Sequence, residues 1–306
     1  MSGPVLAVDV GGTKIAAAIV EPDGILRARA TTATPAGAGG EKVAAALDRL
    51  VRDVAAQGPP ARLVGLGVGS AGPLDIAAGT VSPVNIPDWR PYPILDALRP
   101  ILPGRHAVLA GDGHCMALGE YWRGGHTTAA MLGMVVSTGV GGGLVLDGRI
   151  HAGITGNAGH IGHIVVDLDG PQCPCGGRGC VEALASGPSM TKWALGQGWA
   201  PAGPPDARTL ARDARDGDPV ARAAFQRSAT ALAAGIVCAS GLLDLDDVVV
   251  GGGVAGAGDL LFTPLRAAVA DLAGLAFIRR VRIHPSTLGT DAGLLGAAAL
   301  ILGSTS

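Results

Sequence analysis

The chain carries one pattern twice: an apolar run, a glycine-rich turn and a second apolar run. The first copy is VLAVDVGGTKIAAAIV at residues 5–20, and the second is MLGMVVSTGVGGGLVL at residues 131–146. Two adjacent apolar runs around a glycine turn are typical of a β-hairpin. After each hairpin, apolar residues recur at helical spacing and in short runs, which indicates alternating helices and strands. The repeat therefore predicts a duplicated α/β unit with a cleft between its halves.

The repeat also gives an expected order of elements. In the first half we expect a third strand at 25–32, a helix at 41–57, strands at 62–72 and 107–112, and a helix from 113. In the second half we expect a third short strand after Gly148, a helix from Asp218-Pro219 to about Leu243, a strand at 247–253, a helix from about Asp259, a strand at 281–284 and a final helix from Asp291. The predicted domains are a small N-terminal α/β domain, 1–111 plus 291–306, and a larger C-terminal α/β domain, 112–290.

Charge and hydropathy exclude several classes of protein. The formal net charge of −2 gives no electrostatic reason to bind nucleic acid or an anionic membrane. The N-terminus lacks the basic segment and long apolar core of a secretory signal. The longest apolar stretch with helical character, Ser228 to Leu243, is too short to span a bilayer. We therefore expect a cytoplasmic protein without a membrane partner.

Three glycine-rich turns follow apolar strands: Gly11-Gly12-Thr13-Lys14, residues 137–143 and Gly251 to Gly253. Glycine lets backbone N–H groups approach phosphate oxygens closely, and Thr13 adds a hydroxyl donor. None of the turns has P-loop or Rossmann spacing, and each taken singly is more often an ordinary turn. Two of them occupy equivalent places in the repeats, which favours a nucleotide bound by both halves.

One loop, residues 158–187, holds three of the five cysteines. His163, Cys173, Cys175 and Cys180 offer one nitrogen and three sulfurs, a complete tetrahedral set for structural zinc with no open position for water. The alternative is that three reduced thiols merely share a loop. Because clustered cysteines in a cytoplasmic chain are more often metal ligands than disulfides, the pattern favours zinc.

The segments VLAVDVGGTKIAAAIV, STGVGGGLV, GHIGHIVVD, CPCGGRGCVEALASG and VVVGGGV, in this order, resemble the ROK family of sugar kinases and sugar-responsive repressors. The resemblance implies duplicated actin-like (ribonuclease H-like) domains, ATP and Mg²⁺ as cofactors, a sugar substrate, and a homodimer or homotetramer. It places Asp9 near Mg²⁺ and implies that the nucleotide is bound by Asp9, Gly11, Gly12, Thr13, Lys14, Thr138, Gly139, Gly141, Gly252 and Gly253.

The same resemblance assigns a catalytic base and a sugar site. Asp112, at the end of a strand and the start of a helix, matches the family's base, although an aspartate there can also be only a helix cap. The residues that the resemblance implies for the sugar are Gly72, Asn85, His160, His163 and Glu182. Asn85 can equally lie in an ordinary turn. Family members usually carry asparagine just before the base, where this chain has Gly111.

The expected function is ATP-dependent phosphorylation of the 6-hydroxyl of a hexose. His160 favours N-acetylmannosamine, because glucose-directed members usually carry glutamate there, and an imidazole can both donate to and accept from an acetamido group. The alternatives are a glucokinase, a non-catalytic sugar-sensing regulator and a repressor. A repressor needs a DNA-binding segment before the first strand, which starts here near Val5. ATP and polyphosphate both stay open as donors.

Overall fold

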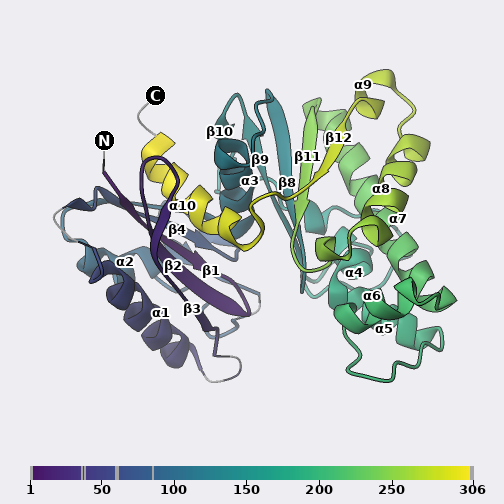
Figure 1. Cartoon of the computed structure of the whole chain (residues 1–306), viewed down its shortest axis with the longest axis horizontal. Helices are drawn as coiled ribbons and strands as arrows, with labels where there is room; N and C mark the ends of the chain where they lie inside the picture. The colour runs from purple at the N-terminus through teal and green to yellow at the C-terminus, as the bar shows by residue number, and fades with distance from the viewer. Residues whose placement is uncertain (1–2, 36, 38, 59–61, 85, 304–306) are drawn as a thin grey trace. The chain divides into compact units, whose positions relative to one another are not determined.

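The computed structural model describes residues 3–35, 37, 39–58, 62–84 and 86–303, which form a mixed α/β fold with two five-stranded sheets (Figure 1). By its internal contacts the chain divides into two compact units. The first comprises 1–127, 143–159 and 290–306, and the second comprises 128–142 and 160–289.

The first sheet has the order β3-β2-β1-β4-β7. Its strands are β1 (Val5–Val10), β2 (Lys14–Val20), β3 (Leu26–Ala33), β4 (Gly65–Ser70) and β7 (His106–Gly111). The strand β1 is antiparallel to β2 and parallel to β4, and β4 is parallel to β7. The strands β1 and β4 are buried on both faces, so they are almost continuously apolar, whereas the edge strand β3 alternates between half-buried and exposed residues. The alternation in residues 25–32 thus arises from an edge strand.

Helices cover this sheet. They are α1 (Gly40–Ala55), α2 (Ile94–Leu98), α3 (Asp112–Arg123) and α10 (Ala292–Leu302), and a small two-stranded sheet joins β5 (Leu74–Asp75) to β6 (Thr80–Val81). The helix α1 buries Val43, Leu47, Val51 and Val54, spaced as one face of a helix, and packs on β2 and β3. The helix α10 packs on β1 and β4. Helices therefore form the outer layers of this unit, and its apolar core lies between them and the sheet.

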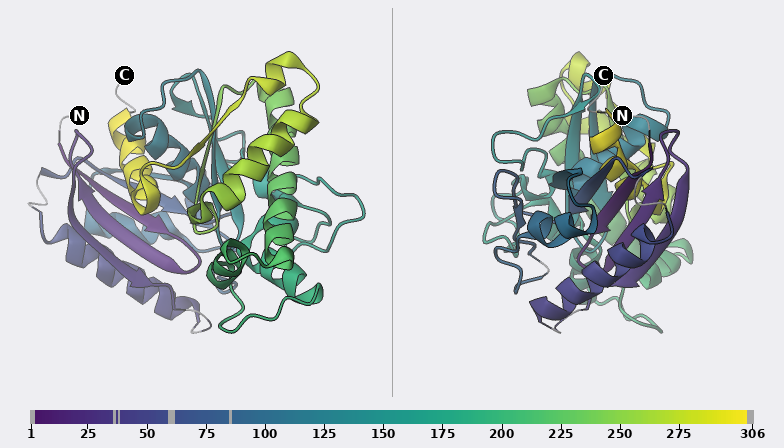
Figure 2. Two further views of the ribbon diagram at one scale, coloured as in Figure 1. Left: turned by 45° about the vertical axis from the view of Figure 1, so that its right-hand side comes forward. Right: turned by 90° about the vertical axis from the view of Figure 1, so that its left-hand side faces the viewer.

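The last helix approaches its neighbours at backbone distance. A β-carbon at Gly67 of β4 would lie only 1.8 Å from the carbonyl oxygen of Ala297, and one at Gly119 of α3 only 2.1 Å from that of Ala292. The helices α3 and α10 therefore lie side by side (Figure 2). This packing groups α3 with the first unit, whereas the predicted domain division at Asp112 assigns α3 to the C-terminal domain.

The second sheet has the order β10-β9-β8-β11-β12. Its strands are β8 (Ala130–Val136), β9 (Val140–Leu146), β10 (Arg149–Ile150), β11 (Asp247–Gly251) and β12 (Arg282–Pro285). The strand β10 is antiparallel to β9, and β11 is parallel to both β8 and β12. Each sheet therefore runs third, second, first, fourth and fifth strand in chain order, which confirms the predicted duplication.

The helices of the second unit are α4 (Val181–Ala185), α5 (Gly187–Gly196), α6 (Ala207–Arg215), α7 (Pro219–Leu243), α8 (Asp259–Leu272) and α9 (Ala276–Arg279). The helix α7 begins as predicted, with the Asp218 carboxylate accepting a hydrogen bond of 2.7 Å from the Ala221 amide. Short 3₁₀ turns lie at η2 (Arg99–Ile101), η3 (Ile161–His163), η4 (Ala255–Ala257) and η5 (Gly289–Asp291). Within the described ranges, the structure contains no helix whose length and apolar character would let it cross a bilayer.

Candidate active site

Two carboxylates lie at one edge of the first sheet. Asp9 is near the carboxyl end of β1, and Asp112 opens α3 directly after β7. Because β1, β4 and β7 are parallel, their carboxyl ends meet at this edge, where α/β sheets bind ligands. Burial, with the charge of Asp112 in addition, raises the pKa of Asp9 to about 7, and Lys14 only partly opposes this. The two crowded carboxylates offer oxygen ligands of the kind that Mg²⁺ prefers.

The raised pKa of Asp9 gives a prediction about stability. The folded protein holds the proton up to about pH 7, whereas an unfolded aspartate loses it near pH 3.8. Stability therefore falls as the pH rises between these values, because the folded state binds more protons. We expect Asp9→Asn to raise the apparent unfolding temperature by a few degrees at pH 8 without Mg²⁺, for a gain on the order of 2 kcal/mol.

Thermal unfolding at pH 5 and pH 8, with and without Mg²⁺, checks this expectation. The difference between variant and parent should be smaller at pH 5. Mg²⁺ should stabilise the parent and leave Asp9→Asn unchanged. A variant that is no more stable than the parent at pH 8 would show that the folded protein tolerates the Asp9 charge without cost.

The first glycine turn, Gly11 to Lys14, joins β1 to β2 beside Asp9. The Gly11 amide donates to the Lys14 carbonyl at 2.9 Å, and the Thr34 hydroxyl donates to the Gly11 carbonyl at 2.8 Å. Thr13 is exposed, and Gly12 and Lys14 are half-buried. The turn is thus fixed by its own backbone, and it presents a hydroxyl and an ammonium group at the same sheet edge as the two carboxylates.

Gly72 follows β4 and lies half-buried before β5. The predicted sugar residue Asn85 lies outside the described residues. Asn157, which the sequence analysis missed, holds the segment after Gly72. Its side chain accepts from the Leu74 amide and donates to the Leu74 carbonyl, both at 2.9 Å. A single amide between two glycine-rich stretches was the available signal.

The second glycine turn, at Thr138, Gly139 and Gly141, joins β8 to β9. The Ser137 amide donates to the Gly139 carbonyl at 2.8 Å, and the Val140 amide donates to the Glu182 carboxylate at 2.8 Å. A β-carbon at Gly139 would lie 2.6 Å from that carboxylate, so a larger residue there would displace the Glu182 side chain. Glu182, which the resemblance implies for sugar binding, therefore also holds the glycine turn.

A cavity of about 620 Å³ opens beside this turn in the second unit. The predicted residues Thr138 and Gly253 line it. Gly252, directly before Gly253, has a φ of +93°, and a β-carbon at Gly252 would lie 2.4 Å from the Val136 carbonyl oxygen. The volume is typical of small-molecule sites. Sequence reasoning missed the lining residues from the region of α5 and α6, which are Gly187, Pro188, Thr191, Lys192, Leu195, Pro205, Asp206, Ala207 and Arg208.

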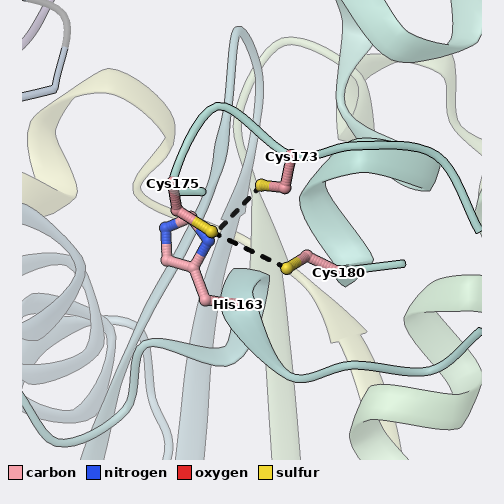
Figure 3. Close-up of side chains that lie close together, drawn as sticks. All are labelled: His163, Cys173, Cys175 and Cys180. Atoms are coloured by element: carbon pink, nitrogen blue, oxygen red, sulfur yellow. Dashed lines mark hydrogen bonds between the residues drawn. The ribbon is translucent and has the colours of Figure 1, made fainter. Parts of the chain in front are cut away.

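The four predicted zinc ligands converge in one cluster (Figure 3). The Cys173 sulfur lies 3.8 Å from Nδ1 of His163, and the Cys175 and Cys180 sulfurs lie 3.8 Å apart. All four ligand atoms lie within 4.8 Å of one another. Zinc–sulfur bonds of about 2.3 Å in a tetrahedron place sulfurs about 3.8 Å apart, whereas a disulfide needs about 2.05 Å. The spacing fits a tetrahedral ion and excludes a disulfide between Cys175 and Cys180.

Backbone bonds hold the two ends of this cluster together. The Val181 amide donates to the Ile164 carbonyl at 3.0 Å, and the Val166 amide donates to the Gly179 carbonyl at 2.9 Å. His163 is thus fixed beside Cys180. The ring of His160, which is exposed, lies 6.0 Å from the ring of His163 with 24° between their planes. Since Nδ1 of His163 faces the sulfurs, Nε2 lies on the opposite side of the ring.

Known proteins that are similar to this chain in sequence and fold include sugar kinases. The chain is 39% identical over 298 residues to the N-acetylmannosamine kinase of Yersinia pseudotuberculosis, covering 97% of each chain. It is 35% identical over 311 residues to the glucokinase of Thermotoga maritima, covering 97% of this chain and 96% of the relative. A solved ROK family glucokinase of Streptomyces griseus, in complex with glucose and AMPPNP, has a TM-score of 0.84 and 31% identity, covering 97% of this chain and 99% of that one.

The predicted fold class is confirmed, because the two duplicated sheets and the structural neighbours are those of the actin-like fold. The match to the ROK family extends over residues 5–304, nearly the whole chain. The resemblance first read from the glycine turns and the cysteine loop is therefore confirmed, and the chain belongs to the ROK family.

Proposed function

We propose that this chain transfers the γ-phosphoryl group of ATP to the 6-hydroxyl of N-acetylmannosamine. The relatives that match this chain over nearly its whole length are named as sugar kinases. This supports a phosphotransferase with an alcohol acceptor. The observation that carries the chemistry is Asp112, a carboxylate at the carboxyl edge of the first sheet beside Asp9.

Phosphoryl transfer to a hydroxyl needs a base on that hydroxyl and fixed donors on the phosphates. In the proposed mechanism Asp112 accepts the proton of the 6-hydroxyl while the hydroxyl oxygen bonds to the γ-phosphorus of ATP, and the bond from this phosphorus to the bridging oxygen of ADP breaks, which releases ADP. The backbone N–H groups of the Gly11 and Gly139 turns, with the Thr13 and Thr138 hydroxyls, bind phosphate oxygens. Asp9 would hold Mg²⁺, which would supply positive charge to the phosphates. The cavity lined by Thr138 and Gly253 has a volume suited to a nucleoside, which favours ATP over polyphosphate as donor.

We further propose that His163, Cys173, Cys175 and Cys180 bind one structural zinc ion. Four protein ligands leave no open position, so the ion orders the loop and takes no part in the reaction. Coordination through Nδ1 fixes the orientation and tautomer of His163, and its Nε2–H then donates to a sugar hydroxyl. Glu182 lies two residues after Cys180, so the same ion also positions this second proposed sugar residue.

His160 supports the choice of sugar. A neutral imidazole offers one donor and one acceptor, which match the carbonyl and N–H of an acetamido group, whereas a carboxylate only accepts. We expect the parent protein to phosphorylate N-acetylmannosamine with a higher kcat/KM than glucose. His160→Glu should shift the ratio toward glucose by about tenfold, which corresponds to one hydrogen bond.

A substrate panel tests the function and the sugar together. ADP production is measured with glucose, mannose, N-acetylglucosamine, N-acetylmannosamine and allose, for the parent, His160→Glu and His151→Glu. His151 is an exposed histidine outside the proposed site, so its variant should keep the parent's ratios. A clear preference of the parent for glucose would favour the glucokinase alternative, which the Thermotoga and Streptomyces relatives support. Binding of sugar without ADP production would favour a non-catalytic regulator.

A further inference from the structure

Besides the cavity at the second glycine turn, the second unit has another cavity, next to the cysteine loop. Its volume is about 400 Å³, which falls within the range of small-molecule sites. We call it the α5–α7 cavity, because α5 and α7 supply its charged side chains. Pro171 and Pro174 line it from the cysteine loop, Lys192, Trp193 and Gln197 from α5 and its C-terminal end, and Arg227 from α7.

Flat apolar groups form one part of the wall of this cavity. Trp193 is half-buried, and Pro171 and Pro174 are exposed. The face of an indole ring carries partial negative charge, which attracts the slightly positive C–H groups of a sugar ring. Tryptophan and proline side chains have few rotatable bonds, so little conformational entropy is lost when a ligand packs on them. These groups therefore suit a cyclic ligand.

The arginine of this cavity is held in place by two contacts. Nη1 of Arg227 donates to the Leu184 carbonyl at 3.1 Å, and the guanidinium carbon lies 5.6 Å from the centre of the Trp193 ring. A guanidinium group has five N–H donors, and the bond to Leu184 engages one of them. Burial lowers the pKa of Arg227, and the charge of Asp167 only partly opposes this. An anion in the cavity would therefore stabilise a charge that burial now disfavours.

Lys192 brings a second positive charge to the same cavity. None of the residues that line it, all of which lie in the described part of the chain, is acidic. Two cations without a lining carboxylate complement a phosphate dianion. The amides of Gln172 and Gln197 and the Ser189 hydroxyl also line the cavity and can form hydrogen bonds with sugar hydroxyls. Charge and shape together favour a phosphorylated sugar over a neutral one.

The α5–α7 cavity and the proposed nucleotide cavity share two residues, Pro188 and Lys192. Both residues belong to α5, so this helix forms part of the wall of each cavity. Lysine carries its ammonium group on a flexible four-carbon stem, so the group can serve an anion in either cavity but not in both at once. Occupation of one cavity therefore changes the positive charge that the other offers.

We propose that the α5–α7 cavity is a regulatory site that binds a hexose phosphate. The sugar ring packs on Trp193, and Arg227 and Lys192 bind the phosphate group. Since the bound phosphate engages Lys192, the hexose phosphate and ATP weaken each other's binding. Binding of the hexose phosphate is independent of the function proposed above, whereas its effect on ATP rests on that function.

Calorimetric titration of the full chain with three probes tests the binding: glucose 6-phosphate, sorbitol 6-phosphate and inorganic phosphate. Sorbitol 6-phosphate has the same charge but an open chain in place of the ring. We expect glucose 6-phosphate to bind about tenfold more tightly than sorbitol 6-phosphate, because only a ring packs on Trp193, and at least about tenfold more tightly than inorganic phosphate. Equal affinities for the three probes would show that charge alone is recognised, which overturns the assignment to a sugar phosphate.

Two matched pairs of variants locate the ligand. Gly196 lines the cavity, and a β-carbon there would meet no atom within 4 Å, so a side chain can be added without a clash. Gly196→Glu should weaken glucose 6-phosphate about tenfold through its charge, whereas Gly196→Gln, of the same shape, should weaken it much less. Arg227→Gln should weaken it about 10- to 100-fold, as expected for a charged hydrogen bond. Arg222→Gln, also on α7, loses a similar bond to the Ala214 carbonyl and should bind as the parent does.

The coupling is measured by adding AMPPNP to the same titrations. We expect glucose 6-phosphate to weaken AMPPNP binding about three- to tenfold, and AMPPNP to weaken glucose 6-phosphate by the same factor, because coupling between two sites is reciprocal. Lys192→Gln should weaken both ligands and bring the coupling factor close to one. Arg227→Gln should keep the parent's KM for ATP and lose most of the inhibition of ADP production by glucose 6-phosphate.

Each contrary outcome has a separate meaning. If Gly196→Glu and Arg227→Gln bind glucose 6-phosphate as the parent does, the ligand binds elsewhere and the assignment is overturned. If saturating AMPPNP abolishes the binding altogether, the phosphate occupies the nucleotide cavity, which also overturns it. A parent that binds no probe, with a Gly196→Glu variant whose molar mass by light scattering differs from the parent's, would assign the cavity to contact with a second copy of the chain. Absence of ADP production with every sugar of the panel overturns the proposed function and leaves the binding results unchanged.

Discussion

Asp112→Asn is expected to abolish turnover, with kcat lowered by about 10²- to 10⁴-fold, the usual contribution of general-base catalysis. An amide keeps the shape of the carboxylate but cannot accept the proton of the 6-hydroxyl. It can still accept from the Gly113 amide, which donates to Oδ1 of Asp112 at 2.7 Å, so α3 should keep its first turn. Sugar and nucleotide affinities, measured by calorimetry, should stay within a few-fold of the parent.

The control for this variant is Asp259→Asn. Asp259 is also the first residue of its helix, α8, and follows a glycine, but it is exposed and lies outside the proposed site. A cap function alone predicts similar, small effects for both variants. If Asp112→Asn turns over within a few-fold of the parent, Asp112 is only a helix cap and the base must be sought elsewhere.

Loss of one zinc ligand is the second large expected effect. We expect purified protein to contain one zinc ion per chain, and we expect Cys175→Ser to lose it. The loss should lower the stability of the folded protein by on the order of 3–5 kcal/mol and weaken sugar binding, because metal binding and ordering of the loop are coupled. Elemental analysis, thermal unfolding and sugar titration measure the three effects.

Exposure makes this prediction specific to the metal. The Cys175 side chain is exposed, so replacing it by serine removes almost no buried surface. Cys238 on α7 is likewise an exposed free cysteine, and Cys238→Ser should change neither zinc content nor stability. Protein with far less than one zinc ion per chain but full activity would show that the loop is ordered without a metal.

Local patterns in the sequence predicted the features that depend on neighbouring residues. The two hairpins, the edge strand at 25–32 and the Asp218 cap of α7 all follow from spacing within a few residues. The cysteine cluster is of the same kind, since its ligands fall within eighteen residues, from 163 to 180, and chemistry alone suggests tetrahedral zinc. Such features depend on residue type and on spacing over a short stretch of chain, and both can be read directly from a sequence.

Features that join distant segments were not predictable in this way. The bond from the Val140 amide to Glu182 spans 42 residues, and that from His114 to Ala158 spans 44. The sequence analysis assigned no helix to residues 187–215, so the cavity wall that α5 and α6 form was missed. Lys192 was one available signal, since the chain has only two other lysines. The predicted domains assigned residues 291–306 to the first unit but placed α3 in the second, because only tertiary packing joins α3 to α10.

The position of α10 along the chain also bears on how the protein is made. The helix covers β1 and β4 and packs on α3, yet the ribosome synthesises it after every residue of the second unit. Until then, apolar residues of β1 and β4 have no partner on that face. Domains generally fold as units during synthesis, the N-terminal one first, and exposed apolar surface makes a partly folded chain prone to aggregate. In this chain the order is reversed: the unit that is begun first can be completed only last, after the whole of the second unit has been synthesised.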